Sequence, residues 1–135
     1  MHIVYNDSKQ IQQEEVIELY QLHQWSSANK PDQLFQALLN SHSLVTARHQ
    51  GKLVGIGNAL SDGHLVVYYP HLLVHPEYQG QQIGKKIMDI MQQKYQHLHQ
   101  QILVSDGATV DFYTKCGFEQ AGETQSMWVY QGKDH

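Results

Sequence analysis

The spacing of apolar residues is helical near the N-terminus of the chain. The stretch IQQEEVIELYQLHQW predicts a helix over residues 11–25, because its apolar side chains recur every three or four positions and its acidic residues come early, where the helix dipole favours them. The stretch KPDQLFQALLNS opens with a proline suited to a first helical turn. It predicts a second, shorter helix over residues 30–41.

The pattern then changes to that of strands. Two β-prone runs flank the turn signal HQG within residues 43–60, which predicts a hairpin, and SDG marks another turn before the run HLVVYYPHLLVH at residues 64–75. We therefore expect three consecutive antiparallel strands. Pro70 lies inside the third and cannot donate to a ladder, so it should mark a bulge or a place where neighbouring strands part.

The last third of the chain alternates helices and strands. An apolar stripe predicts a central helix over residues 83–98, and QILVSD at 101–106 predicts a short buried strand. A short helix should follow at 107–118, ended by Gly117, and SMWVYQ at 126–131 suggests a last strand. The resulting order, ααβββαβαβ, predicts one α/β domain over residues 1–135, with a mixed sheet covered by helices.

Composition excludes several functional classes. The 135 residues carry a net charge of −4 with only nine Lys and Arg, which argues against nucleic acid as a partner. The chain has no leader pattern and no apolar run near the roughly 20 residues needed to cross a bilayer, so we expect a cytoplasmic protein without a membrane partner. The ten histidines are scattered and the one cysteine, Cys116, is expected to be a small buried residue, so no metal site is predicted.

The loop QGQQIG at residues 79–84 precedes the central helix. A helix N-terminus offers unpaired N–H groups to an anion, and Gly80 and Gly84 allow close approach to one, with Lys85 and Lys86 in the first turn. Glycines also serve ordinary turns, and neither a dinucleotide-binding nor a P-loop pattern fits here. The loop alone therefore leaves a phosphate site and a simple strand-to-helix connection both open.

Two stretches together resemble one family. LLVHPEYQGQQIGKKIM, followed some thirty residues later by VDFYTKCGFE, is similar to the acetyl-CoA signature and the Phe-Tyr-x-x-x-Gly-Phe segment of the GCN5-related N-acetyltransferase (GNAT) superfamily. Small members likened to serotonin N-acetyltransferases are the most similar branch. The resemblance implies an α/β (α+β) GNAT fold. In this fold a mixed and mostly antiparallel central sheet is splayed at its fourth strand and has helices on both faces. The chain departs from the signature at Gln82, where glycine is usual; its side chain would crowd the pyrophosphate or donate to it.

The resemblance also implies a function. It points to an acetyl-CoA-dependent N-acetyltransferase that acts on the primary amine of a small molecule (amino acid, polyamine or arylalkylamine) by direct transfer in a ternary complex. A protein N-acetyltransferase and a non-catalytic acyl-CoA-binding sensor remain alternatives. The residues expected to bind the cosubstrate, acetyl-CoA, are Leu72, Leu73, Val74, Gln79, Gly80, Gln81, Gln82, Ile83, Gly84, Lys85, Asp106 and Tyr113.

Two residues are candidates for catalysis. Tyr113 matches the family tyrosine placed near the CoA sulfur, where a phenol can hydrogen-bond to or protonate the leaving thiolate; without the motif, an aromatic contact between helix and sheet would explain it. His71 precedes the splay and could accept the amine proton directly or through water, although a histidine bonded to a neighbouring carbonyl fits equally well.

Substrate contacts and self-association are the remaining expectations. Trp25, Ser26, Tyr69 and His71 are the expected substrate-binding residues. Tryptophan and tyrosine at such positions are also common in cores. A homodimer is a further expectation, because the last strand could pair with a partner or exchange with it.

Overall fold

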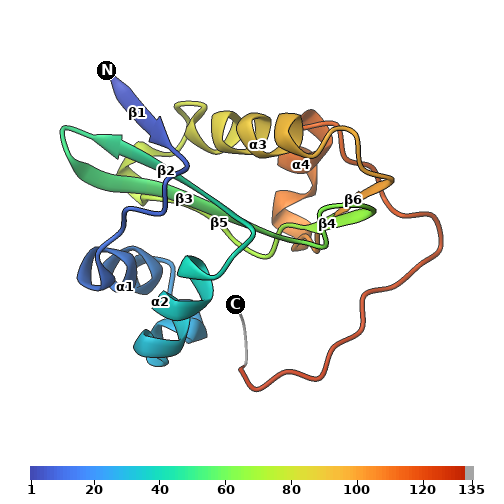
Figure 1. Cartoon of the computed structure of the whole chain (residues 1–135), viewed down its shortest axis with the longest axis horizontal. Coiled ribbons are helices and arrows are strands. Elements are labelled where there is room, and N and C mark those ends of the chain that lie inside the picture. Colours follow the sequence, from blue (N-terminus) through green and yellow to red (C-terminus); the bar gives the residue numbers. More distant parts are fainter. Residues whose placement is uncertain (133–135) are drawn as a thin grey trace.

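A computed structural model of the chain describes residues 1–132. Its strands form one mixed sheet, and helices cover both faces of this sheet (Figure 1). The elements in chain order are β1 (Ile3–Asn6), α1 (Gln13–Leu22), η1 (Ser26–Asn29), α2 (Pro31–Leu39), β2 (Ser43–His49), β3 (Lys52–Ser61), β4 (Val66–Tyr68), β5 (Leu72–Val74), η2 (Pro76–Tyr78), α3 (Ile83–Lys94), β6 (Gln100–Ile102), η3 (Gly107–Thr109) and α4 (Val110–Lys115), where η denotes a 3₁₀ helix.

The sheet is antiparallel except at one pair. Its strand order is β1-β2-β3-β4-β6, and β5 pairs with β3 beside β4. The β4–β6 pair is parallel, and the other pairs are antiparallel. The predicted third strand is therefore broken into β4 and β5 by residues 69–71, and both halves pair with β3. Pro70 lies in this break, which confirms its predicted place.

The core has two parts, one on each face of the sheet. Helices α1 and α2 cover one face and α3 and α4 cover the other (Figure 1). β3 is buried on both sides and carries Gly55 and Gly57 beneath α3. A Cβ on Gly57 would lie 2.8 Å from Cγ2 of Ile87, so the absent side chain is what lets α3 approach the sheet so closely.

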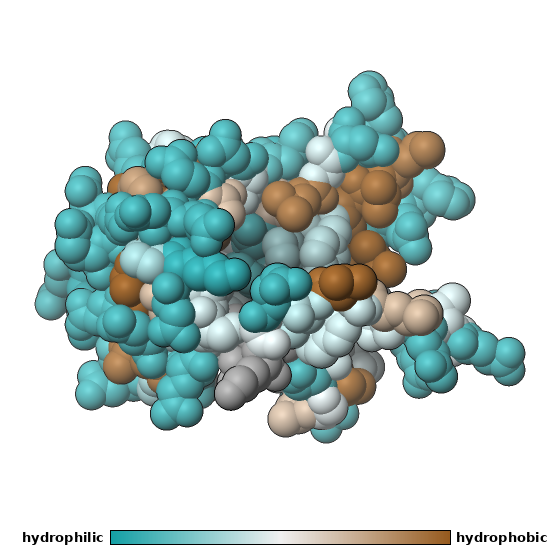
Figure 2. Space-filling model, turned by 90° about the horizontal axis from the view of Figure 1, so that it is seen from below, coloured by the Kyte–Doolittle hydropathy of each residue, from teal (hydrophilic) through white to brown (hydrophobic). Residues whose placement is uncertain are grey.

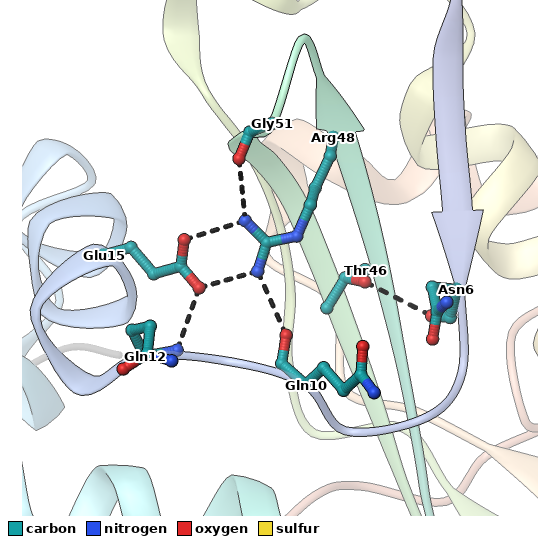
Figure 3. Close-up of polar contacts among 7 residues, drawn as sticks. All are labelled: Asn6, Gln10, Gln12, Glu15, Thr46, Arg48 and Gly51. Atoms are coloured by element: carbon teal, nitrogen blue, oxygen red, sulfur yellow. Dashed lines mark hydrogen bonds and ion pairs between the residues drawn. The ribbon is translucent and has the colours of Figure 1, made fainter.

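One ion pair fixes the start of α1 against the sheet. The guanidinium of Arg48, on β2, contacts both carboxylate oxygens of Glu15 at 2.8 and 2.6 Å (Figure 3). It also donates to the carbonyls of Gly51 and Gln10, and Glu15 in turn accepts from the N–H of Gln12 as part of a capping box. The hydrogen bond from Arg48 lowers the pKa of Glu15, so the pair stays charged at neutral pH. Because α1 carries Tyr20 and ends at its C-cap residue, His23, this contact also positions part of the site described below.

Most predicted elements are confirmed, and two expectations at the termini are wrong. The hairpin turn at Gln50–Gly51 has positive φ at both central residues, as two-residue hairpin turns require, and Gly117 follows α4 with φ 95°. The prediction missed β1, whose four residues are too few for a recognisable period and which pairs only with β2. The strand expected at 126–131 does not form: residues 119–130 pair with no strand of the described residues.

Candidate active site

The site begins where the sheet splits. β6 runs beside β4, and the N–H of Tyr69 still donates to the carbonyl of Ile102 at 3.1 Å. Beyond that point β5 stays with β3, whereas the chain after β6 pairs with no strand among the described residues. The break at Pro70 therefore opens a gap between β5 and the chain that follows β6, as the resemblance implied.

The bend is held by a buried asparagine that the sequence analysis did not single out. Asn58, 4% exposed on β3, accepts from the N–H of His71 through Oδ1 (3.0 Å) and donates its own N–H to the carbonyl of His71 (3.1 Å). Its Nδ2 donates to Oγ of Ser41 at 3.0 Å. A buried side chain with its polar atoms bonded in this way fixes the backbone conformation, because an alternative conformation would leave buried groups unpaired.

The register leaves one edge of β5 open. The N–H of His75 donates to the carbonyl of Val54 (2.8 Å), and the carbonyl of His71 accepts from Asn58, so the alternate residues 71, 73 and 75 face β3. Leu72 and Val74 therefore direct their N–H and C=O groups away from β3, into the gap. The Val74 carbonyl accepts from Nε2 of His23 (2.8 Å) and from Nε2 of Gln79 (3.2 Å). The N–H of Leu72 has no partner within residues 1–132 and is open to a ligand.

The predicted loop at 79–84 lies between η2 and the N-terminus of α3, and Gln79 ties it to the open edge of β5 through the Val74 contact. Gly80 has φ 80°, a left-handed conformation that favours glycine. A Cβ on Gly84 would lie 3.3 Å from the Phe112 ring, so this glycine serves the packing of α4 on α3. The first N–H groups of the 12-residue helix α3, which lack helical partners, thus lie beside the open strand edge, an arrangement suited to an anion.

The side chains of two residues expected to bind the cosubstrate, Lys85 and Ile83, are engaged within the protein itself. Lys85 pairs with Asp89 one turn along α3, and this hydrogen bond raises the pKa of the lysine. Ile83 is 2% exposed in the core, so only its backbone is available to a ligand. The positive charge of Lys85 is therefore partly neutralised by its own helix.

Gln82 is the helix N-cap, with φ 68° and ψ 11°. The left-handed conformation explains why glycine is usual in the family at this position, since a non-glycine residue there costs about 1–2 kcal/mol. Gln82→Gly should therefore increase the free energy of unfolding by up to about 1 kcal/mol, after subtracting the entropy that glycine adds to the unfolded chain.

Urea denaturation of the two proteins checks this prediction, and lower stability of the variant would contradict it. The KM for acetyl-CoA in the same pair of proteins separates the two expected effects of the Gln82 side chain. A lower KM in the variant means that the glutamine crowds the pyrophosphate, and a higher KM means that it donates to it.

A cavity of about 1400 Å³ adjoins the splay. One wall is the α1–α2 connection with Ser26, the floor is the bend with Tyr68 and His71, and a second wall is the loop after β6 with Asp106. The remaining side is formed by the C-terminal segment, residues 119–132, through positions 126–128 and 130–132. The structure thus brings Ser26, His71 and Asp106 to one cavity.

Two other predicted substrate residues do not line this cavity. Trp25 stands behind His71, with ring centroids 5.1 Å apart in an edge-to-face contact. Tyr69 is 5% exposed, and its hydroxyl donates to Gln101 on the α3 side of the sheet. Its neighbour Tyr68 lines the cavity instead. Tyr69 is therefore not part of the acceptor site proposed below.

Tyr113 lies on α4, between Phe112 and Phe118, whose ring centroids are 5.0 and 6.1 Å from its own. Burial is the main cause that raises its pKa to about 12, and the nearby Cys116 and Asp106 add to the effect. Its hydroxyl forms no hydrogen bond within residues 1–132. Cys116 is buried as expected, and burial raises the pKa of its thiol, so it remains protonated at neutral pH.

The described residues contain no group of three or more His, Cys, Asp or Glu side chains placed to hold a metal ion. Among the same residues, no helix has the length and apolar character that a membrane span requires.

Comparison with known proteins identifies the family. The chain matches the family model of the acetyltransferase (GNAT) domain over residues 7–128. It therefore belongs to the GNAT acetyltransferases.

Three relatives illustrate the extent of the similarity. The chain is 34% identical over 68 residues to an uncharacterized N-acetyltransferase, ycf52, of Gracilaria tenuistipitata var. liui, covering 49% of this chain and only 37% of that protein. A GNAT-family acetyltransferase of Streptococcus pneumoniae has the same fold at TM-score 0.84 and 27% identity, covering 97% of this chain and 100% of that one. AAC(6')-Iy, solved with the bisubstrate analogue CoA-S-monomethyl-acetylneamine, shares the fold at TM-score 0.72 and 15% identity, with 98% and 99% coverage.

Proposed function

We propose that the chain is one N-acetyltransferase domain that transfers the acetyl group of acetyl-CoA to the primary amine of a small molecule, in a ternary complex. The observation that carries this proposal is the open edge of β5 beside the N-terminus of α3, where the N–H of Leu72 has no partner within residues 1–132. A thioester and a pyrophosphate on one molecule need this pair of features at adjacent places. The cavity on the other side of the splay supplies room for the amine.

The residues present fit acetyl-CoA. Backbone N–H groups of the loop at 79–84 and of the first turn of α3 would hold the pyrophosphate, and the Leu72 and Val74 backbone would pair with the amides of the pantetheine arm. Gln79 links the two regions through the Val74 carbonyl. When bound, acetyl-CoA supplies an activated acyl group.

Transfer forms a C–N bond and breaks the C–S bond, and the amine proton ends on the thiol or in solvent. The N–H of Leu72 would donate to the carbonyl oxygen as negative charge develops on it. Tyr113 would donate a hydrogen bond to the leaving sulfur. At a pKa of about 12, it does not give up its proton completely to a thiolate whose acid has a pKa of about 8.5, because that transfer is uphill by about 5 kcal/mol.

The acceptor cavity favours an amine with an apolar body. The side formed by the C-terminal segment carries Trp128, stacked on Tyr130 with ring centroids 4.6 Å apart, and the Tyr130 hydroxyl contacts Oγ of Ser26 at 3.1 Å. Trp128 is 68% exposed. Exposed aromatic surface at a cavity suits contact with a ligand rather than with the core. Figure 2 shows apolar side chains gathered toward the end of the molecule that carries β4, β6 and the C-terminal segment.

Trp128→Ala should raise the KM for the acceptor amine about 2- to 10-fold, which corresponds to the free energy of one aromatic contact. The KM for acetyl-CoA should stay unchanged. Steady-state kinetics with each substrate varied in turn checks this. If both KM values rise equally, or if neither changes, the C-terminal segment is not part of the acceptor site.

A thiol-release assay tests the proposed function. The full chain is mixed with acetyl-CoA and a panel of amino acids, polyamines, arylalkylamines and short peptides, and free CoA is followed. Release that depends on one small amine supports the proposal and names the acceptor class. Release with peptides alone supports a protein N-acetyltransferase. Calorimetric binding of acetyl-CoA with no release for any amine supports a non-catalytic sensor instead.

We propose further that the protein is cytoplasmic. We also propose that it forms a homodimer in which two copies are joined along β6. This strand is the last of the sheet, and its outer edge pairs with no other strand of residues 1–132. Ile102 is 36% exposed there, and an open apolar edge favours pairing with another strand. Sedimentation should therefore give a mass that falls toward the monomer on dilution and in Ile102→Lys. A constant monomer mass at all concentrations would exclude this dimer.

A further inference from the structure

His71 is held by a tyrosine buried behind it. Tyr20, on α1, is fully buried, and its hydroxyl lies 2.8 Å from Nδ1 of His71. The rings meet edge to face at 5.4 Å, and Trp25 packs against both. Within residues 1–132, Nδ1 of His71 is the one hydrogen-bond partner of the Tyr20 hydroxyl.

The direction of this hydrogen bond follows from burial. Burial raises the pKa of Tyr20, so the hydroxyl keeps its proton at every working pH. A buried O–H without an acceptor costs about 1–3 kcal/mol, and Nδ1 is the acceptor within reach. Tyr20 is therefore the donor and Nδ1 accepts. In a neutral imidazole whose Nδ1 accepts, the proton is on Nε2.

We propose that Tyr20 fixes His71 as the Nε2–H tautomer, so that His71 presents a hydrogen-bond donor, and not a general base, to the acceptor cavity. This inference rests on the proposed function for the identity of the cavity. Tyr20 is then a positioning residue. For Nε2 to accept a proton, the neutral ring would first have to carry its proton on Nδ1, and the ring would then become charged with an N–H at both nitrogens. Each change reverses the Tyr20 hydrogen bond and strands the buried O–H.

This assignment has two consequences for the reaction. The donor N–H of His71 suits an acceptor molecule that carries an oxygen, such as a carboxylate or hydroxyl, near its amine. The ammonium form of the acceptor must then lose its proton to solvent, for which the open cavity of about 1400 Å³ leaves room.

Nitrogen-15 NMR of the full chain labelled at histidine tests the tautomer without any substrate. The His71 signals are assigned by their loss in His71→Gln. We expect a protonated Nε2 and an unprotonated Nδ1 in the wild type, and a shifted tautomer equilibrium in Tyr20→Phe. Tyr95→Phe is the matched control, because it removes another hydrogen bond between a tyrosine and a histidine, the 2.6 Å contact with His42, and should leave the His71 signals unchanged. A protonated Nδ1 in the wild type would overturn the proposal.

Kinetics supply the second readout. His71→Gln keeps an N–H donor but has no basic nitrogen, whereas His71→Leu has neither. We expect kcat/KM for the acceptor to stay within about 10-fold of wild type in the first variant and to fall further in the second, by the value of one hydrogen bond to a charged or polar group. Equal, large losses in both would mean that His71 is a base. A wild type that releases no thiol with any amine would end the proposed function, whereas the NMR result would still decide the tautomer.

Discussion

Leu72→Pro is expected to lower kcat/KM by about 100- to 1000-fold while the protein remains folded. Proline removes one backbone N–H, and in the proposed mechanism the N–H of Leu72 is the donor to the developing oxyanion, an interaction worth about 2.7–4 kcal/mol. This N–H points away from β3, so its loss breaks no hydrogen bond of the ladder. Proline is tolerated in strands at such positions, where the N–H side is open.

Two variants give this experiment its controls. Leu72→Ala loses the side-chain contacts but keeps the N–H, and should lose far less activity than the proline variant. Leu73→Pro removes an N–H that the register directs at β3 and disturbs a side chain that is 1% exposed, so it should fail to fold or melt much earlier. Circular dichroism separates the folded variants from the unfolded one. A folded Leu72→Pro with near-wild-type activity would remove the oxyanion role of this edge.

Local signals explain what the sequence predicted well. Pro70 has a fixed φ and no N–H, so this single residue was enough to predict the break in the strand. The loop from Gln79 to Gly84 and the helix after it are encoded by adjacent residues, and the structure places them as expected. The hairpin turn at Gln50–Gly51 is likewise marked by a glycine, Gly51, which tolerates positive φ.

The bend itself limits what periodicity can predict. In a regular strand, His71 and Tyr69 would share one face, which made Tyr69 a reasonable substrate residue. The break at residues 69–71 interrupts that alternation, so Tyr68 and His71 line the cavity while Tyr69 enters the core. Sequence position identified the region, but the local irregularity decided which side chains line the cavity.

Long-range partners account for the rest. Asn58, Tyr20 and His23 contact the bend and β5 across sequence separations of 13 and 51 residues, and each has an ordinary sequence context on its own strand or helix. The segment SMWVYQ has the apolar residues of a strand, yet a strand needs an adjacent edge to pair with. The segment pairs with no strand of the described residues, and Met127 and Val129 stay 94% and 97% exposed.

Tyr113→Phe is expected to lower kcat about 10- to 150-fold and to leave the dissociation constant of acetyl-CoA unchanged. The hydroxyl has no partner within residues 1–132, so its removal strands no buried group, and Phe112 and Phe118 keep the ring in place. The loss corresponds to one hydrogen bond to a charged sulfur, about 1.5–3 kcal/mol. Single-turnover thiol release gives the rate of transfer, and calorimetry gives the binding of acetyl-CoA.

The pH profile separates Tyr113 from an ordinary tyrosine. Its pKa of about 12 means that the hydroxyl stays protonated, and active, until the pH passes well beyond 10. We therefore expect no fall in wild-type kcat between about pH 8 and pH 10, whereas an unperturbed tyrosine, with a pKa of about 10, would already lose activity there. Tyr130→Phe is the control for an exposed tyrosine at the far side of the cavity and should change acceptor KM rather than kcat. If Tyr113→Phe retains full kcat, the leaving thiolate departs without help from this residue.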